Sequence, residues 1–284
     1  MEQDMNELLL QSIESMPPLP QTIIELQKYL DSNGEDIDIN KVAKIIVNDP
    51  LVTAKLLQLA NSPFYGFSRE ISTIQQVINL LGVANIRNII AADAVRSNLK
   101  VDMSPYNLET STFLANCHEE TRFIIDWISQ EDKKLSHLLV PCAMLLRFGM
   151  MVFANFLIQS HKDKDFLASL KENNFENLSA IEENFLGVDH LSFLGFLFYR
   201  WNFDDLVTES VVFATSPHSA ENHIKKNAYA LAIANTIFDP YNDGSNVNIA
   251  LNLIEEASEQ GIKFNVDNFK AKLPDFAKNK ILNA

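Results

Sequence analysis

The sequence predicts an all-α fold, and the scarcity of glycine is the first observation behind that prediction. Only 8 of the 284 residues are glycine, whereas average usage of about 7% would give roughly 20. The glycines lie too far apart for a GxGxxG fingerprint, a P-loop or a GxSxG elbow, which excludes those nucleotide-binding and hydrolase motifs. Between the few turn signals, apolar residues recur at helical spacing, which is the second observation.

Five helices are predicted before residue 99. They cover residues 23–30, 42–46, 49–60, 72–82 and 83–98. Asp49 and Pro50 begin the third helix, because aspartate accepts a free backbone N–H and proline suits the first helical position. Ser72 is predicted to cap the fourth helix and Gly82 to end it.

A connector over residues 98–108 is predicted to separate two packed helical subdomains, residues 1–105 and residues 106–284. The second subdomain begins near Glu109 with a helix that runs to about Ile128. Further helices are predicted over residues 138–158, 187–201, 206–213 and 228–237. Two or three more follow a turn-rich loop at residues 239–246.

The apolar run from Leu138 to Ile158 is long enough to cross a bilayer, and Arg147 is its only full charge. An arginine near the centre of such a span costs roughly 2.5–3.5 kcal/mol on insertion scales. Pro141 and Asn155 weaken the pattern further, and basic clusters that would set an orientation are missing from both flanks. A helix that is apolar all round also suits the centre of a large core. We therefore predict a buried core helix and no membrane contact.

Composition limits the class of protein and its partners. The net charge is −14 and the isoelectric point is near 4.8, which disfavours an extended nucleic-acid interface because that needs clustered lysine and arginine. Cys117 and Cys142 form no CxxC pair, and the first residues lack the positive region of a secretory signal. These features favour a cytoplasmic protein in a reducing compartment.

Three stretches carry a family resemblance. They read MPPLPQTIIELQKYL, VAKIIVNDPLVTAKLLQLANSPFYG and ISTIQQVINLLGVANIRNII. In order, they contain Leu-Pro, a helix opened by Asp-Pro, Ala-Asn-Ser followed by an aromatic residue and glycine, and a helix that ends in Leu-Gly. This pattern resembles the HDOD family ("HD-related output domain") over residues 12–92, and the chain matches it more loosely to about residue 238. The resemblance implies a bacterial signal-transduction output module whose second subdomain is HD-like.

The HDOD family is similar to the HD and HD-GYP phosphohydrolases, whose metal ligands follow the order H…HD…H…HH…D. By that resemblance, His118 matches the first histidine, Arg147 stands at the metal-bridging aspartate, His190 matches the intermediate histidine, and Asn235 falls near the final aspartate. Three other ligand positions are also replaced, by Leu146, Ala214 and Thr215. A guanidinium has no acceptor lone pair and repels a cation. We therefore expect no metal or other cofactor and no metal-dependent phosphohydrolase activity.

Each of these relic-site residues also has a structural interpretation. Arg147 has to find an acid or backbone carbonyls inside the core, so it belongs either to a structural ion pair, which we favour, or to an anion-binding relic pocket. Its candidate partners are Glu119, Glu120, Glu183 and Asp189. His118 is expected to be a partly buried, hydrogen-bonded core histidine. His190 is expected in a first helical turn, behind Asp189 as the N-cap.

Asn61, Ser62 and Tyr65 form a second candidate, because a polar and aromatic loop of this kind can line a binding cleft. The alternative is that Asn61 and Ser62 close the preceding helix through side-chain hydrogen bonds. The sequence leaves both interpretations open.

Residues 75–93 resemble a helix-turn-helix with Gly82 at the turn. The face predicted to be exposed offers Asn85, Arg87, Asn88 and Arg96. Any short helix hairpin in an α-bundle gives the same pattern, and the acidic net charge makes nucleic-acid binding an alternative only. The favoured function is a non-catalytic regulatory module that binds a protein partner in a signalling pathway or a small-molecule ligand. A metal-dependent phosphohydrolase of the HD superfamily is the other alternative.

Overall fold

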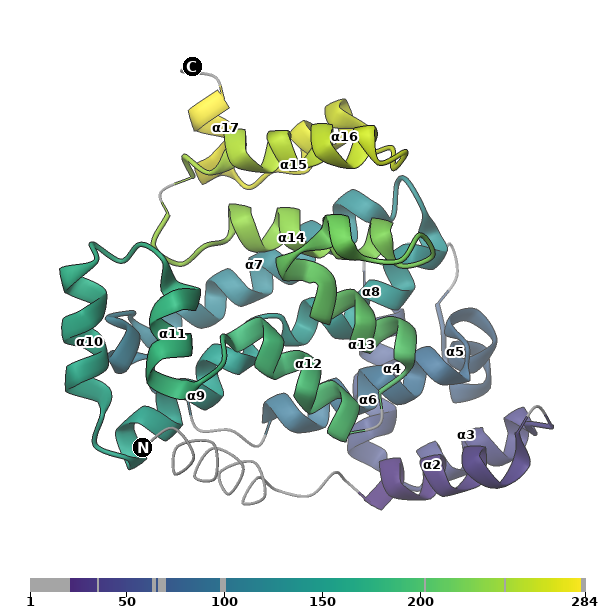
Figure 1. The fold of residues 1–284 in the computed structure, drawn as a ribbon. Coiled ribbons are helices and arrows are strands. Elements are labelled where there is room, and N and C mark those ends of the chain that lie inside the picture. The colour runs from purple at the N-terminus through teal and green to yellow at the C-terminus, as the bar shows by residue number, and fades with distance from the viewer. Residues whose placement is uncertain are drawn as a thin grey trace. The chain divides into compact units, whose positions relative to one another are not determined.

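The computed structural model describes residues 21–34, 36–62, 65, 70–97, 101–201, 203–242 and 244–281, and every regular element among them is a helix (Figure 1). The all-α prediction is therefore confirmed. The Leu-Pro motif and the aromatic-glycine motif of the family resemblance lie outside these described residues. The chain divides into two compact units, one formed by Pro17–Asn98 and the other containing Leu99–Ala284. Each unit is described by itself.

The first unit holds the predicted helices. They are α2 (Gln21–Asn33), α3 (Ile39–Val47), α4 (Pro50–Ala60), α5 (Ile74–Leu81) and α6 (Val83–Ser97). Asp49 is the N-cap of α4, and its carboxylate accepts hydrogen bonds from the backbone N–H groups of Leu51 and Val52. These bonds hold the pKa of Asp49 below its ordinary value.

The cap of α5 lies one residue later than predicted. Thr73, and not Ser72, is the N-cap, and its hydroxyl accepts from the backbone N–H of Gln76 at 3.3 Å. The Gln76 side chain accepts in turn from the backbone N–H of Thr73 at 3.2 Å, which completes a capping box. The capping box requires a glutamine or glutamate three residues after the N-cap. Gln76 stands three residues after Thr73, so the N-cap falls on Thr73. Gly82 ends the helix with φ of 80°, as predicted.

The helix hairpin formed by α5 and α6 bends by 109° at Gly82. One of the four polar residues predicted on the exposed face of its second helix does not lie there. Asn88 is buried, with 1% of its surface exposed, and its side-chain carbonyl accepts a hydrogen bond from Arg87. The prediction that Asn88 is exposed is therefore wrong. The side chain of Arg96 lies outside the described part of the chain.

The described helices of the second unit are α7 (Thr110–Ile128), α8 (Lys133–Leu145), α9 (Phe148–Gln159), α10 (Asp163–Glu172), α11 (Leu178–Leu186), α12 (His190–Arg200), α13 (Asp205–Val212), α14 (Lys225–Ile237), α15 (Val247–Glu259), α16 (Val266–Lys272) and α17 (Asp275–Ile281). The unit is built around α7, α8, α9 and α14, which contribute most of its buried side chains. Helices α15, α16 and α17 form its last layer, where α15 packs on α14 and α16 packs on α7 (Figure 1). Short 3-10 turns lie at Ser104–Tyr106, Phe213–Thr215 and Pro217–Ser219.

The long apolar run is buried, but it is not one regular helix. Among the described residues, Lys133–Gln159 is long and apolar enough to cross a membrane, and 83% of its most apolar window is buried inside the fold. The run separates into α8 and α9 at Leu146 and Arg147, and Arg147 is the N-cap of α9. This break corrects the prediction of a continuous helix through Arg147. It occurs where the one charged side chain of the run has to reach its partners.

Candidate functional site

Arg147 forms a buried, bidentate ion pair with Glu120 of α7. Its Nε lies 2.9 Å from Glu120 Oε2 and its Nη2 lies 3.0 Å from Oε1, while Nη2 also donates to the backbone carbonyl of Asn235 at 3.0 Å. The side chains of Arg147 and Glu120 are only 5% and 1% exposed. The predicted buried ion pair is therefore confirmed, with Glu120 as the partner among the four candidates.

This geometry also explains which charge state the pair adopts. Burial raises the pKa of the Glu120 carboxyl, and the adjacent Arg147 guanidinium opposes that rise. An arginine side chain does not give up its proton in a protein. The bidentate contact with this permanent charge favours the ionised form of Glu120, in which the pair is close to neutral as a unit.

A second buried network lies next to this pair and is centred on Glu182 of α11, which is fully buried. Glu182 Oε1 accepts from the hydroxyl of Tyr106 at 2.8 Å, and Oε2 accepts from the backbone N–H of His190 at 2.9 Å. The same Oε2 lies 2.7 Å from His190 Nδ1. Because the carboxylate accepts there, Nδ1 carries a proton. Burial and Glu182 both raise the pKa of Tyr106.

The chain brings His190 to this place through a close contact between helices. His190 is the first residue of α12, behind Asp189, whose carboxylate caps the helix as predicted. A Cβ atom at Gly149 would overlap the carbonyl oxygen of His190. Gly149 therefore allows the start of α12 to approach the start of α9, where Arg147 stands.

These residues surround a cavity of about 410 Å³. Three of the four predicted relic-site residues, Arg147, His190 and Asn235, line it. His190 Nε2 and Asn235 Oδ1 are buried and have no hydrogen-bond partner among the described residues. The described residues that line it are Arg147, Asn177, Leu178, Ser179, Ala180, His190, Asn235, Asp239 and Pro240.

His118 does not belong to this cavity. It is exposed on α7, so the expectation that it is partly buried is wrong. The residue of α7 that reaches the site is Glu120, two positions further along the helix. Sequence reasoning missed Glu182 and Tyr106, because their contacts join elements far apart in the chain.

The donor set around the cavity does not fit a dimetal centre of the HD type. His190 and Asp239 are the only lining residues with an imidazole, thiol or carboxylate side chain. The described residues contain no group of three or more His, Cys, Asp or Glu side chains placed to hold a metal ion. The guanidinium of Arg147 occupies the position that the family resemblance gives to a bridging carboxylate.

In the first unit, Asn61 closes the helix that precedes it through side-chain hydrogen bonds, which is the structural alternative to a role in a binding cleft. It is the C-cap of α4, and its Nδ2 donates to the backbone carbonyls of Leu57 at 2.9 Å and Ile71 at 2.7 Å. Its Oδ1 accepts from the backbone N–H of Ile71 at 2.8 Å. Tyr65 is buried in the core, and Ser62 is half-buried. The side chain of Asn61 therefore closes α4 and ties it to the segment before α5.

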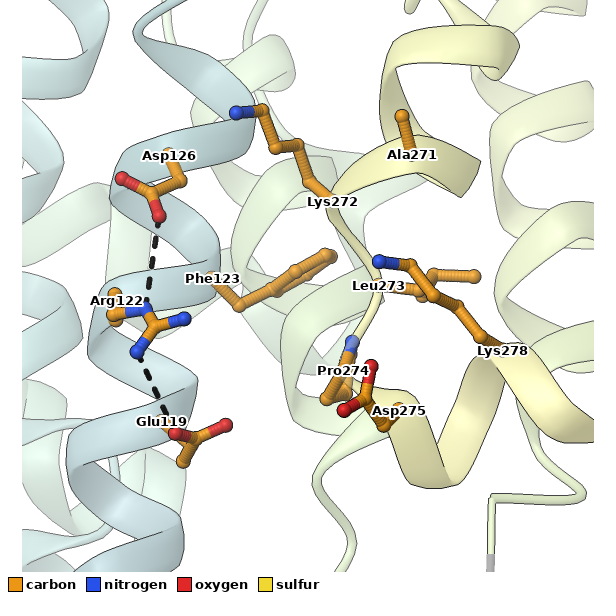
Figure 2. A pocket seen from close by; sticks show the side chains of 10 residues that line it. All are labelled: Glu119, Arg122, Phe123, Asp126, Ala271, Lys272, Leu273, Pro274, Asp275 and Lys278. Atoms are coloured by element: carbon orange, nitrogen blue, oxygen red, sulfur yellow. Dashed lines mark ion pairs between the residues drawn. The ribbon is translucent and has the colours of Figure 1, made fainter.

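A second cavity of the second unit has a different character. It measures about 330 Å³ and lies between α7 and the last two helices (Figure 2). Arg122, which is 74% exposed, pairs loosely with Glu119 at 3.8 Å and with Asp126 at 3.7 Å. Lysine side chains come from α16 and α17, and Phe123 lies between the two walls (Figure 2). The charged side chains of both signs are solvated, which indicates a surface groove. None of the buried polar atoms without a partner in the described residues belongs to its lining.

Comparison with known proteins places these features in a family. The model of the HDOD domain matches residues 16–217. Among solved structures, a virulence factor from Campylobacter jejuni subsp. jejuni is 57% identical, and the alignment covers 99% of this chain and 98% of that chain with a TM-score of 0.65.

Two more distant structures share the fold. A candidate phosphohydrolase from Shewanella amazonensis SB2B is 24% identical, with 94% and 93% of the two chains covered and a TM-score of 0.63. An HDOD domain protein of unknown function from Geobacter sulfurreducens is 19% identical, with 95% and 97% covered and a TM-score of 0.53. A search of curated proteins finds no significant match.

Proposed function

Because the chain belongs to the HDOD domain family, we propose that it is a regulatory module of bacterial signal transduction, acts in the cytoplasm, and works by binding and not by catalysis. The partner is a protein of the signalling pathway or a small ligand that changes how such a protein is bound. Nucleic acid is not the partner in this proposal, since the net charge is −14 and Asn88 of the helix hairpin is buried.

The observation that carries the proposal is the Arg147–Glu120 pair. An HD-type hydrolase needs a metal-bound hydroxide as its nucleophile. Here a buried guanidinium, held by three hydrogen bonds, lies where the family resemblance puts the bridging carboxylate. It cannot ligate a cation, because it has no acceptor lone pair. The polar residues that line the cavity beside it can still contact a ligand, which supports a role in binding.

The competing function is metal-dependent phosphohydrolysis, and one experiment separates the two. Purified full-length protein is incubated with Mn²⁺, Fe²⁺ or Mg²⁺ and assayed for hydrolysis of p-nitrophenyl phosphate and bis(p-nitrophenyl) phosphate, with its metal content measured by elemental analysis. We expect rates equal to those of the blank. Metal-stimulated hydrolysis that a chelator and His190→Ala both abolish would overturn the proposal.

The binding role needs its own test. The protein is used as bait in an extract of its native cells, and each captured protein is then purified and tested for direct binding by calorimetry. We expect at least one direct partner of the signalling class. If every captured protein fails the direct test, the protein-binding form of the proposal is wrong.

A further inference from the structure

The cavity that Arg147 lines contains buried polar atoms without a hydrogen-bond partner among the described residues. His190 lines it and is 3% exposed, and its Nε2 is one of these atoms. Nε2 is an acceptor in the tautomer whose single ring proton lies on Nδ1, against Glu182. Asn235 Oδ1 is a second buried acceptor without a partner in the described chain. Asp239 adds a carboxylate to the same lining. Buried polar atoms are normally satisfied, so these acceptors call for a donor that the protein does not supply.

Unused donors belong to the residues of α11 that line the same cavity. Asn177 through Ala180 form the N-terminal turn of α11, and the Asn177 side chain makes no capping hydrogen bond. The first backbone bond of this helix joins Ile181 N–H to the Asn177 carbonyl. None of the hydrogen bonds between described residues uses the N–H groups of Leu178, Ser179 or Ala180. Such a helix end favours an anion, because its free N–H groups and dipole point outward.

Arg147 contributes to the donor side as well. Its contacts with Glu120 and Asn235 use Nε and Nη2, and leave the N–H groups of Nη1 outside these bonds. Since Arg147 lines the cavity, its Nη1 group is a further donor for an oxyanion.

The charges of the site exclude a simple ion. Glu120 neutralises Arg147 through a bidentate contact, so a dianion such as phosphate would face Asp239 with little positive charge to balance it. A simple cation would meet the positive end of α11, whose free N–H groups cannot ligate it. A ligand that carries one positive and one negative group satisfies both the acceptors and the donors.

We propose that this cavity binds a small zwitterion of the amino-acid type. Its ammonium group donates to His190 Nε2, Asn235 Oδ1 and the Asp239 carboxylate, and its carboxylate accepts from the first turn of α11 and from Arg147. The volume of about 410 Å³ suits such a molecule. Leu178, Ala180 and Pro240 supply apolar wall for its side chain. The inference rests on the ligand-binding form of the proposed function and names its ligand class.

The test uses the full chain and the twenty protein amino acids as probes, each titrated by isothermal calorimetry. For the amino acid that binds best, the matched controls are its N-acetyl derivative, which lacks the ammonium group, and its methyl ester, which lacks the carboxylate. We expect both controls to bind at least about tenfold more weakly, which corresponds to about 1.4 kcal/mol.

Two pairs of variants locate the binding site. Ser179→Asp places a carboxylate at the helix N-terminus, which stabilises the helix but competes with the ligand carboxylate, whereas Ser179→Asn keeps the size without the charge. Asn235→Leu removes the acceptor, whereas Asn235→Asp keeps it. We expect affinity to fall at least about tenfold in Ser179→Asp and Asn235→Leu. Ser179→Asn and Asn235→Asp are expected to bind within about threefold of the original protein. Circular dichroism checks that all four fold.

Three outcomes would overturn the inference. One is that no amino acid binds at concentrations up to about 10 mM, which would mean that the cavity holds water only. Another is that the acetylated or esterified probe binds as tightly as the free amino acid. The third is equal affinity in Ser179→Asp and Ser179→Asn. None of these results depends on the hydrolase or partner assays, so this inference and the proposed function fail separately.

Discussion

Removing the guanidinium from the Arg147–Glu120 pair is the sharpest test of the structural reasoning. In Arg147→Met, the Glu120 carboxylate keeps its burial, at 1% exposure, and loses both of its charged hydrogen bonds. The carbonyl of Asn235 loses a donor as well. Breaking a buried pair by removing one partner costs about 3–5 kcal/mol. With a urea m-value of about 2–3 kcal/mol/M, the unfolding midpoint should fall by about 1–2.5 M.

Tryptophan fluorescence gives a direct readout of this change. The chain has two tryptophans, Trp127 and Trp201, and both belong to the unit that contains Arg147. Urea titration followed by fluorescence therefore reports the unfolding of that unit. Arg122→Met is the matched control on α7, because Arg122 is 74% exposed and its ion pairs are long. Its loss should change stability by no more than about 0.5 kcal/mol.

A double variant separates charge burial from loss of packing. Arg147→Met combined with Glu120→Leu replaces both charges with apolar groups, and such replacements of a buried pair are often neutral or stabilising. We expect the double variant to recover most of the stability that Arg147→Met loses. An unchanged midpoint in Arg147→Met, or a double variant that is less stable than the single one, would refute the reasoning about this pair.

Three further predictions follow from other contacts. Gly149→Ala should destabilise the second unit by about 1–3 kcal/mol in the same urea titration, because its Cβ would overlap the His190 carbonyl; an unchanged midpoint would contradict this. Tyr106→Phe removes one donor to buried Glu182 and should cost about 1–3 kcal/mol, whereas Tyr241→Phe, at a part-buried bond to a backbone carbonyl, should cost less. The pKa of Glu109 is lowered to about 2 by Ser111 and Thr112; its stabilising effect is present above its unfolded pKa of about 4.3 and is lost as pH falls toward about 2. Glu109 is the N-cap of α7, and a carboxyl NMR titration that places its pKa near the ordinary value would show that this cap is not formed in solution.

The sequence predicts local structure well where one residue acts on its own neighbours. Asp49 caps α4 and Gly82 ends α5 as predicted, since each effect depends on a few adjacent backbone groups. Thr73 was missed because two neighbouring hydroxyl residues compete for the same cap, and the Gln76 side chain chooses between them. The break between α8 and α9 was missed for another reason. Apolar periodicity does not reveal where a chain bends to direct one charged side chain to its partners.

The candidate site was predicted in part, again for physical reasons. A guanidinium in an apolar run has to be paired, so the burial of Arg147 and its need for an acid follow from the sequence. Which face of α7 packs against Arg147 depends on tertiary packing and cannot be read from the local sequence. That packing brings Glu120 to the site and leaves His118 exposed. The network of Glu182 joins residues 76 positions apart in the chain. No local sequence pattern predicts such a contact.

The Arg147–Glu120 pair explains how the cavity keeps its shape with a donor set that does not fit a metal centre. Arg147 starts α9, contacts Glu120 on α7 and donates to Asn235 on α14, so one side chain connects three helices of the core. In a metal centre of the HD type, a cation would draw side chains from several helices together. A planar guanidinium with bonds in fixed directions can make equivalent connections. Its charge is balanced by Glu120, while His190 Nε2 and Asn235 Oδ1 have no partner among the described residues. The arginine on which our proposal against catalysis rests therefore lines the same cavity as the unsatisfied polar groups on which the proposed binding function rests.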